Sequence, residues 1–336
     1  MNGQIQRNRS ALYQCVAESL ALWPVPDDAA IDLINISENA TFLISAADGH
    51  KTVLRVHRPD YHDQATIAAE LTWMAELNRT GIIHTPAIIP GHDGSLIQRH
   101  QIPGQPPHDM VMFAFVAGRE PDQSQPLDTL FHHLGKLSAQ LHQQVQTWPI
   151  PDGFTRPHWD IEGIYGQIKR WGDWRHAPHL TMNMHQILEQ TEQVVSERLI
   201  AYGKSHDRYG LIHADMRLAN LLVEGNDMRR VHVIDFDDCG FGWFMYDFAA
   251  GISFIEDDPK IPQLKSAWLE GYQEQRPLTK EDVMLVDTMI MLRRMLLLAW
   301  VGSHKDADIV ADLEKDFGRI TVMLAERYLA DANYAF

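Results

Sequence analysis

The sequence has few cysteines, no excess of basic residues and no long apolar run. Its two cysteines in 336 residues, Cys15 and Cys239, are too few for a disulfide framework and indicate reduced thiols. The 29 Lys and Arg residues against 45 Asp and Glu give a formal net charge of −16, which disfavours general affinity for nucleic acid or an anionic membrane. The longest strongly apolar stretch, Met289–Val301, is too short to span a bilayer and carries Arg293 and Arg294 in its middle.

The sequence also lacks targeting and repeat signals. Residues Met1–Ser10 have no apolar core of a signal peptide, so we expect an intracellular, cytoplasmic protein without a membrane anchor. No internal repeat or long low-complexity tract is present. A chain of 336 residues is long enough for two lobes with a sizeable core.

Hydrophobic patterning divides the chain into two parts. The first third predicts one helix, Asp63–Arg79, and a set of strands: Ile31–Ile36, Thr41–Ala46, Lys51–His57, Pro86–Ile89, Ser95–Gln98 and Met110–Val116. After Pro121 helical periodicity dominates, interrupted by a β-rich segment from Leu211 to Asp238. We predict an α+β protein with a β-rich N-terminal lobe, residues 1–117, and a mainly helical C-terminal lobe, residues 118–336.

The strongest chemical signal is a spaced set of polar residues. His213, Asp215 and Asn220 lie on one loop, and Asp235 follows the apolar strand Val231–Ile234. Phosphoryl transfer needs positioning, charge neutralisation and a carboxylate at the incoming hydroxyl, which an Asp-x-x-x-x-Asn loop with a second Asp can supply. Magnesium prefers such hard oxygen ligands. A lone His-x-Asp is usually an ordinary polar loop, but the whole set is far more specific.

This set resembles the aminoglycoside phosphotransferase family, which includes choline kinases, type II homoserine kinases and some bacterial stress-response protein kinases. The resemblance runs roughly from Ile31 to the final helices and implies a protein-kinase-like fold with ATP and Mg²⁺ as cofactors. By this match Asp215 is the catalytic base and His213 shapes its loop, while Asn220 and Asp235 hold Mg²⁺.

The sequence departs from the protein-kinase pattern in ways that favour a small-molecule kinase over a regulated protein kinase. Ala214 occupies a position that is Arg in many protein kinases and often Gly in this family. Asp237 stands where protein kinases have the Gly of their Asp-Phe-Gly motif. Tyr246 follows Asp235 by only eleven positions, which leaves no room for a long activation loop. A stress-response type protein Ser/Thr kinase remains the alternative, and a nucleotide-binding regulator without turnover is a third. The oligomeric state is left open.

The nucleotide-binding signals are weaker. Arg55 stands where kinases place the strand lysine that contacts the α- and β-phosphates, and Glu70 on the next helix can hold it there. The alternative is an exposed arginine and a solvated glutamate.

No glycine-rich phosphate loop is present, and the candidate in its place is Ser37–Phe42, with Asn39 and Thr41 facing the phosphates. The alternative is a plain β-turn. The segment that carries Phe113 and Phe115 is expected to supply backbone groups for adenine.

The acceptor is expected to be a small hydroxyl-bearing molecule: an amino alcohol, a hydroxy amino acid, a sugar or an aminoglycoside. Glu256 and Asp257 follow a helix expected to border its cleft, so they are candidates to bind an amino group, or else they form a solvated cap. Arg293 is a candidate to bind an acidic group of the acceptor. The alternative is that Arg293 or Arg294 forms a structural bridge to Asp247 or another carboxylate, because a buried arginine needs a partner. Asp247 is expected to anchor the catalytic loop.

Overall fold

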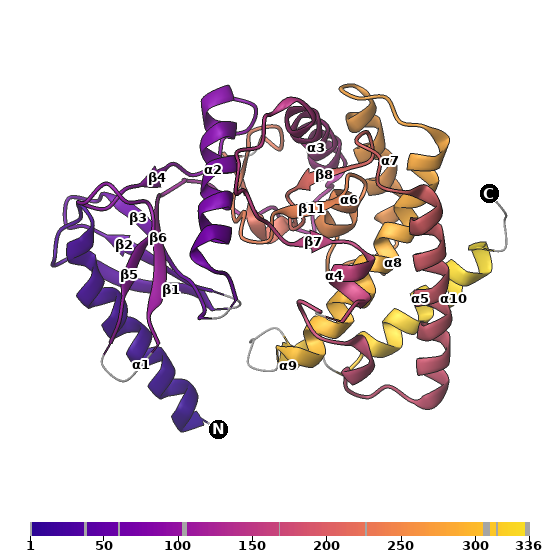
Figure 1. Ribbon diagram of the computed structural model, residues 1–336, viewed down its shortest axis with the longest axis horizontal. Coiled ribbons are helices and arrows are strands. Elements are labelled where there is room, and N and C mark those ends of the chain that lie inside the picture. The colour runs from indigo at the N-terminus through magenta and orange to yellow at the C-terminus, as the bar shows by residue number, and fades with distance from the viewer. Residues whose placement is uncertain are drawn as a thin grey trace. The chain divides into compact units, whose positions relative to one another are not determined.

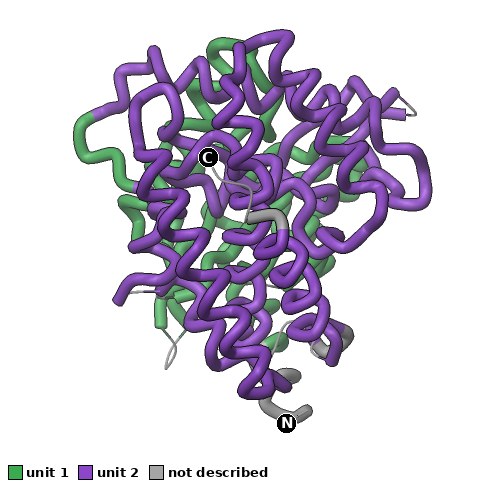
Figure 2. The backbone as a smooth tube through the Cα atoms, turned by 90° about the vertical axis from the view of Figure 1, so that its right-hand side faces the viewer, with its two compact units in different colours: residues 1–117, 152–155 green, residues 118–151, 156–336 purple. Residues whose placement is uncertain are grey.

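The computed structural model describes residues 2–36, 39–59, 61–102, 106–167, 169–225, 227–304, 310–313 and 315–332. It separates into two compact units, which Figure 2 colours separately. Unit 1 comprises residues 1–117 with 152–155, and unit 2 comprises residues 118–151 with 156–336. Among the described residues, no helix is long and apolar enough to cross a membrane.

Unit 1 is built on one antiparallel sheet with the strand order β1-β2-β3-β6-β4, and β5 pairs with β6 at its edge. The strands are β1 (Ala30–Ile36), β2 (Ala40–Ser45), β3 (Lys51–Val56), β4 (Ile88–Ile89), β5 (Gln98–His100) and β6 (His108–Ala114). Alternation of buried and less buried residues along β2 turns one side chain in two toward the core, as expected for a half-buried strand.

The first helix, α1 (Asn2–Ser19), corrects the expectation of a single helix in this part of the chain. It lies beside the sheet in Figure 1, and Cys15 and Val16 pack into the core of unit 1 with Phe42 and Leu54. Polar residues dominate the helix, so its apolar positions are few and their three- and four-residue spacing is easily overlooked.

The second helix, α2 (Gln64–Thr80), begins and ends at recognisable caps. Asp63 accepts a hydrogen bond from the Thr66 amide at 2.8 Å, and Gly81 ends the helix with φ of +68°. The buried residues of α2 include Ile67, Leu71 and Trp73, and Glu70 is fully buried among them. The helix therefore holds a charged side chain inside unit 1, and that charge requires a partner.

Unit 2 is mainly helical. Its helices are α3 (Asp128–Thr147), α4 (Ile161–Tyr165), α5 (Met182–Tyr202), α6 (Tyr246–Gly251), α7 (Ile261–Gln273), α8 (Lys280–Ser303), α9 (Val310–Leu313) and α10 (Phe317–Ala332). Helices α3 and α7 meet at two glycines: a Cβ on Gly135 would lie 2.0 Å from the Trp268 carbonyl oxygen, and one on Gly271 would lie 1.8 Å from the His132 carbonyl oxygen. Only glycine permits this approach of the two backbones.

Short strands of unit 2 position the loops that carry the predicted chemistry. The strands are β7 (His158–Trp159), β8 (Tyr209–Ile212), β9 (Leu221–Val223), β10 (Val231–Val233) and β11 (Gly240–Trp243). One sheet has the order β7-β11-β8, and β9 pairs with β10 as a hairpin. The loop 213–220 therefore runs between β8 and the hairpin, and the loop 234–239 runs from the hairpin to β11.

Candidate active site

The carboxylate of Asp215 is held at both of its oxygens. Arg293 donates from Nη2 to Oδ1 at 2.7 Å, and Asn220 donates from Nδ2 to Oδ2 at 2.7 Å. Arg217 Nε lies farther away, 3.4 Å from Oδ2. The side chain of Asp215 keeps 13% of its surface exposed, so the carboxylate remains accessible to a ligand. A carboxylate that is fixed yet accessible has the geometry required of a general base.

Asp247 anchors the backbone of the loop around Asp215, as expected. Asp247 accepts hydrogen bonds from the backbone amides of Ala214 at 2.8 Å and His213 at 3.4 Å, and it contacts Nε2 of buried His142 at 2.9 Å. Ala214 adopts φ of +64°, a left-handed conformation that is unfavourable for a residue with a Cβ. The bonds to Asp247 hold the loop in this strained conformation.

His213 is fully buried, so it shapes the loop and cannot touch a substrate in this arrangement. Its Nδ1 accepts a hydrogen bond from the Asp215 amide at 3.2 Å, and its ring packs against Phe236 with centroids 4.5 Å apart. Burial lowers the pKa of His213 below its ordinary value of 6.5, which favours the neutral ring. The neutral ring keeps Nδ1 available as the acceptor for the Asp215 amide.

The two predicted metal ligands lie at one end of the β9–β10 hairpin. Asn220 comes directly before β9 and Asp235 follows β10, and the Ile234 amide donates to the Asn220 carbonyl at 3.0 Å. Because Asn220 uses Nδ2 to bind Asp215, its Oδ1 is the atom left for a cation. An amide oxygen and a carboxylate match the oxygen ligands that Mg²⁺ takes beside phosphate and water.

The loop that carries Asp235 is clamped through its backbone. Arg156 donates from Nε to the Cys239 carbonyl at 2.5 Å and from Nη2 to the Asp237 carbonyl, and Trp159 Nε1 donates to the Asp238 carbonyl at 2.7 Å. Asp235 itself is exposed and has φ of +59°. The clamp therefore fixes the residues that follow Asp235 and stabilises its strained backbone.

In unit 1, Arg55 and Glu70 form a buried ion pair. Arg55 Nη2 lies 2.7 Å from both Glu70 oxygens, and the guanidinium carbon lies 5.1 Å from the centroid of the Phe113 ring. Thr41 of β2 is the register partner of Arg55 on β3. The alternative of an exposed arginine and a solvated glutamate is therefore wrong for this pair, and Glu70 fixes the orientation of Arg55.

The other residues predicted to bind nucleotide differ in how far they are buried. Asn39 is mostly buried, and its Oδ1 accepts a hydrogen bond from the Arg58 amide at 3.3 Å. Phe113 is buried, whereas Phe115, which follows β6, is 41% exposed. Ser37 and Glu38 of the predicted phosphate loop lie outside the described residues.

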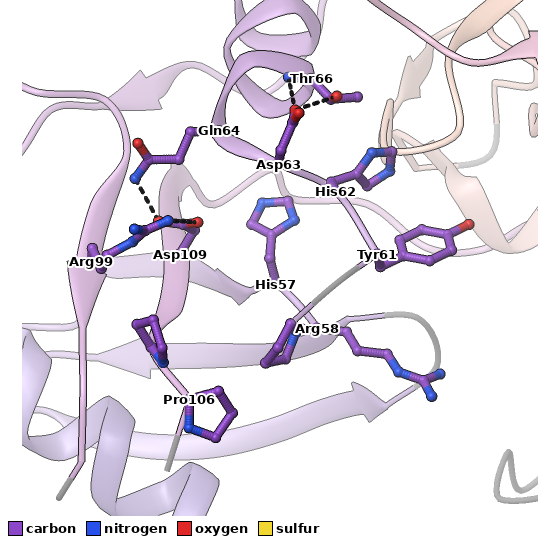
Figure 3. A pocket seen from close by; sticks show the side chains of 12 residues that line it. His57, Arg58, Tyr61, His62, Asp63, Gln64, Thr66, Arg99, Pro106 and Asp109 are labelled. Carbon is purple, nitrogen blue, oxygen red and sulfur yellow. Dashed lines mark hydrogen bonds and ion pairs between the residues drawn. The ribbon is translucent and has the colours of Figure 1, made fainter.

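A pocket of about 620 Å³ in unit 1 adjoins the strand and the helix that carry Arg55 and Glu70 (Figure 3). The His57 ring lies at its centre in that view. The two carboxylates that line the pocket are already hydrogen-bonded within the protein: Asp63 accepts from Thr66, and Asp109 accepts from both Arg99 and Gln64. These internal bonds tie the shape of the pocket to the start of α2.

The residues predicted to bind the acceptor lie in different environments. Glu256 is 5% exposed and pairs with Arg294 at 2.6 Å, so an acceptor amine has no access to its carboxylate in this arrangement. Asp257 is exposed. Arg293 is buried and binds Asp215, so its guanidinium does not face solvent. The structural bridges weighed for Arg293 and Arg294 are present, but their carboxylates are Asp215 and Glu256. The suggested partner Asp247 instead binds His142 and the catalytic-loop amides.

Three residues at this site had no assigned role in the sequence analysis. Ser253 accepts a hydrogen bond from Arg293 Nε at 2.9 Å, and Tyr246 accepts one from Nη1 at 3.4 Å. Burial would lower the pKa of Arg293, but the interactions of Arg293 with the Tyr246 hydroxyl and with the negative charge of Asp215 outweigh burial, and Asp238 also contributes to raising that pKa. Asp238 therefore lies within electrostatic reach of the Asp215 cluster. The sequence signal that could have indicated Asp238 is the pair of adjacent acids, Asp237 and Asp238, that follows Asp235 and Phe236.

Comparisons with known proteins identify the family of this chain. The model of the phosphotransferase enzyme family matches residues 33–280, more than half of the chain. A solved structure of a microcompartment-associated aminopropanol kinase is 39% identical, with a TM-score of 0.89 over 96% of this chain and 99% of that one. Amicoumacin kinase of Bacillus subtilis (strain 168) is 22% identical over 290 residues, which cover 80% of this chain and 79% of that protein.

The fold has a further relative in amicoumacin kinase hAmiN, solved in complex with AMP-PNP, Ca²⁺ and Ami. Its TM-score is 0.75 at 19% identity, over 95% of this chain and 93% of that one. The protein-kinase-like fold expected from the resemblance is confirmed, as is the resemblance itself. The chain belongs to the phosphotransferase enzyme family and is a kinase that transfers phosphate from ATP to a hydroxyl group of a small molecule.

Proposed function

We propose that the protein transfers the γ-phosphate of magnesium-bound ATP to the hydroxyl of a small amino alcohol. The observation that carries the acceptor class is the 39% identity, over 96% of the chain, to an aminopropanol kinase. A primary amine near the hydroxyl also suits a protein whose formal net charge is −16, because the long-range field attracts cations.

Each lobe supplies a separate part of the chemistry. In unit 2, Asp215 orients the acceptor hydroxyl and receives its proton, and its fixed carboxylate supports this role. Asn220 and Asp235 hold Mg²⁺, which neutralises phosphate charge when bound. In unit 1, Arg55 contacts the nucleotide phosphates in the orientation set by Glu70.

The segment after Asp235 supports a small-molecule acceptor over a protein acceptor. Residues 235–246 include β11, which pairs with both β7 and β8, and lead directly into α6. This part of the described chain forms a sheet strand and turns, and it contains no long loop of the kind that phosphorylation orders in regulated protein kinases.

The acceptor amine requires a carboxylate, and Asp238 is the candidate that the site favours. It is partly exposed and lies three positions after Asp235. Burial raises the pKa of Tyr246, which binds Arg293, and the charge of Asp238 adds a smaller contribution in the same direction. Asp257 keeps its predicted role as a second candidate because it is exposed. Asp238→Asn is expected to raise the Michaelis constant for an amine acceptor about tenfold or more, as expected for a charge-assisted contact of about 1.5–3 kcal/mol.

A cytoplasmic location is part of the proposal. The cysteines Cys15 and Cys239 are both free and buried, which suits a compartment that keeps thiols reduced and supplies ATP.

A coupled nucleotide-consumption screen tests the function. The purified protein is assayed with Mg²⁺ and ATP against 1-amino-2-propanol, ethanolamine, hydroxy amino acids, sugars, aminoglycosides and a generic protein substrate. The proposal expects the highest kcat/KM with an amino alcohol and loss of turnover in Asp215→Ala. Higher kcat/KM with a sugar, a hydroxy amino acid or the protein would reject the amino alcohol as the acceptor class.

A further inference from the structure

Two adjacent arginines are buried in the middle of α8. Arg293 and Arg294 each keep 1% of their side-chain surface exposed, and each forms an ion pair with a carboxylate. A buried charge destabilises a fold unless it is paired and hydrogen-bonded. The two pairs differ in their partners, because Arg294 binds the buried Glu256, whereas Arg293 binds the accessible Asp215.

The guanidinium of Arg293 is bound on several sides by the protein itself. Nε donates to Ser253 Oγ at 2.9 Å, Nη1 donates to the Tyr246 hydroxyl at 3.4 Å and Nη2 donates to Asp215 Oδ1 at 2.7 Å. The guanidinium carbon also lies 5.0 Å from the centroid of the Trp171 ring. With these contacts and its burial, Arg293 has no surface with which to recognise an acidic group on an acceptor.

The contacts of Arg293 determine how the Asp215 carboxylate is oriented. If Asn220 were its only close partner, at Oδ2, the carboxylate could rotate about that hydrogen bond. The bond from Arg293 fixes Oδ1 as well and prevents this rotation. Arg293 is in turn held by Tyr246 of α6 and by Ser253 in the turn that follows α6, so these two contacts set its orientation. Phosphoryl transfer depends mainly on positioning, and a misplacement of about 1 Å can reduce the rate about 10²-fold.

We propose that Arg293 is a positioning residue that acts through Asp215 and does not bind the acceptor. This inference rests on the proposed function, because it takes Asp215 as the base. It replaces the acceptor-binding role that the sequence suggested for Arg293. The proposal gives Ser253 and Tyr246 an indirect part in the same task, since each holds Arg293 in place.

The kinetic consequence separates positioning from binding. A residue that binds the acceptor changes the Michaelis constant for the acceptor, whereas a residue that only orients the base changes kcat. Arg293→Met is expected to lower kcat about 10²-fold and to leave the Michaelis constants for ATP and for the acceptor within about threefold of the wild-type values. Arg293→Lys is expected to recover part of kcat, because lysine restores the charge at Asp215 without the planar fork that also reaches Ser253 and Tyr246.

Arg294→Met is the matched control. It removes a neighbouring arginine with the same burial and also breaks an ion pair, but Arg294 does not contact Asp215. We expect it to lower the melting temperature and to leave kcat of the folded protein unchanged. If Arg294→Met lowers kcat as much as Arg293→Met does, the loss reflects the packing of α8 and the positioning role is wrong.

A double variant tests whether Arg293 acts through Asp215. In the Asp215→Ala background the carboxylate is gone, so Arg293→Met should cause no further loss of kcat. A further loss of tenfold or more would mean that Arg293 acts on the reaction directly. Wild-type turnover in Asp215→Ala alone would refute the proposed base, which is a failure of the proposed function and is distinguishable from a failure of this inference.

The test does not depend on the stability of one variant. If Arg293→Met is recovered unfolded, Ser253→Ala and Tyr246→Phe carry the measurement, because they keep every charge and remove one bond to Arg293 each. Each is expected to lower kcat about three- to tenfold with unchanged Michaelis constants, in line with the loss of one hydrogen bond. A raised Michaelis constant for the acceptor at unchanged kcat, in these variants or in Arg293→Lys, would overturn the proposal in favour of acceptor binding.

Discussion

Replacing Glu256 by glutamine separates the two roles considered for this glutamate, which are stabilising the fold as the partner of Arg294 and binding the amine of the acceptor. The carboxylate lies 2.6 Å from Arg294 Nη1, and the side chains of the pair are 0% and 1% exposed. Arg294 is held further by Thr321 Oγ1 at 2.9 Å and by the Phe317 carbonyl at 3.3 Å. Glu256 Oε1 is buried without a hydrogen-bond partner among the described residues, so Arg294 is the main stabilising contact of this carboxylate.

The magnitude follows from the loss of one charge of a buried pair. Removing one partner typically costs about 3–5 kcal/mol, because the other charge is left buried and unpaired. Glu256→Gln keeps the shape and an oxygen that can accept from Arg294, so we expect about 3 kcal/mol. In a large domain each kcal/mol lowers the melting temperature by about 2–4 °C, so a decrease of roughly 6–12 °C is expected. The Michaelis constant for the acceptor should not change.

Thermal unfolding and acceptor kinetics are measured on the same preparations. Asp257→Asn is the control, since Asp257 is the adjacent acid and is exposed, and its replacement should change stability by less than about 0.5 kcal/mol. The double variant Glu256→Leu with Arg294→Met should recover most of the lost stability, because apolar residues can replace a buried ion pair at little cost. An unchanged melting temperature with a tenfold higher Michaelis constant for the acceptor in Glu256→Gln would refute this reasoning.

Four further outcomes are expected. Asp215→Ala should lower kcat about 10²–10⁴-fold with nearly unchanged nucleotide affinity, measured by steady-state kinetics and nucleotide titration. Asp235→Ala should abolish most of the Mg²⁺-dependent gain in ATP affinity, and an unchanged gain in calorimetric titrations would exclude it as a ligand. Arg55→Met should raise the Michaelis constant for ATP or lower kcat, and Arg55→Lys should restore part of the loss. Burial lowers the pKa of His142, so the folded state binds fewer protons than the unfolded state, and the free energy of unfolding should fall as pH decreases below about 6.5. Urea unfolding midpoints between about pH 7.5 and 5.5 measure this dependence, and His142→Gln should make the midpoint depend less on pH.

Local spacing explains why the sequence indicated that the residues of the candidate catalytic loop lie together. Asp215 and Asn220 lie five positions apart, and Asp235 follows a short strand, so the hairpin β9–β10 brings the three together through nearby residues. The Arg55 and Glu70 pair is similar, because β3 and α2 are consecutive elements. Short-range patterns of this kind survive in the sequence because neighbouring elements usually pack on one another.

The partners of the α8 arginines could not be predicted in the same way. Arg293 reaches Asp215 across 78 positions and Arg294 reaches Glu256 across 38. The hydrophobic pattern of α8 indicated that both arginines are buried and need carboxylates, but it gave no means of choosing which carboxylates. Helix α1 was missed for a different reason, because its few apolar residues complete a core contributed mainly by the distant strands β2, β3 and β6.

These pairings change where acceptor recognition has to be sought. The two charged residues that the sequence offered for opposite substrates, Glu256 for an amine and Arg293 for an acid, are both bound inside the protein. Neither can discriminate among acceptors without breaking a buried ion pair, and that would cost more free energy than a single exposed contact returns. We therefore propose the exposed Asp257 and the partly exposed Asp238 as the residues to test for acceptor binding, and a contact to either carboxylate would favour a cationic acceptor over an anionic one.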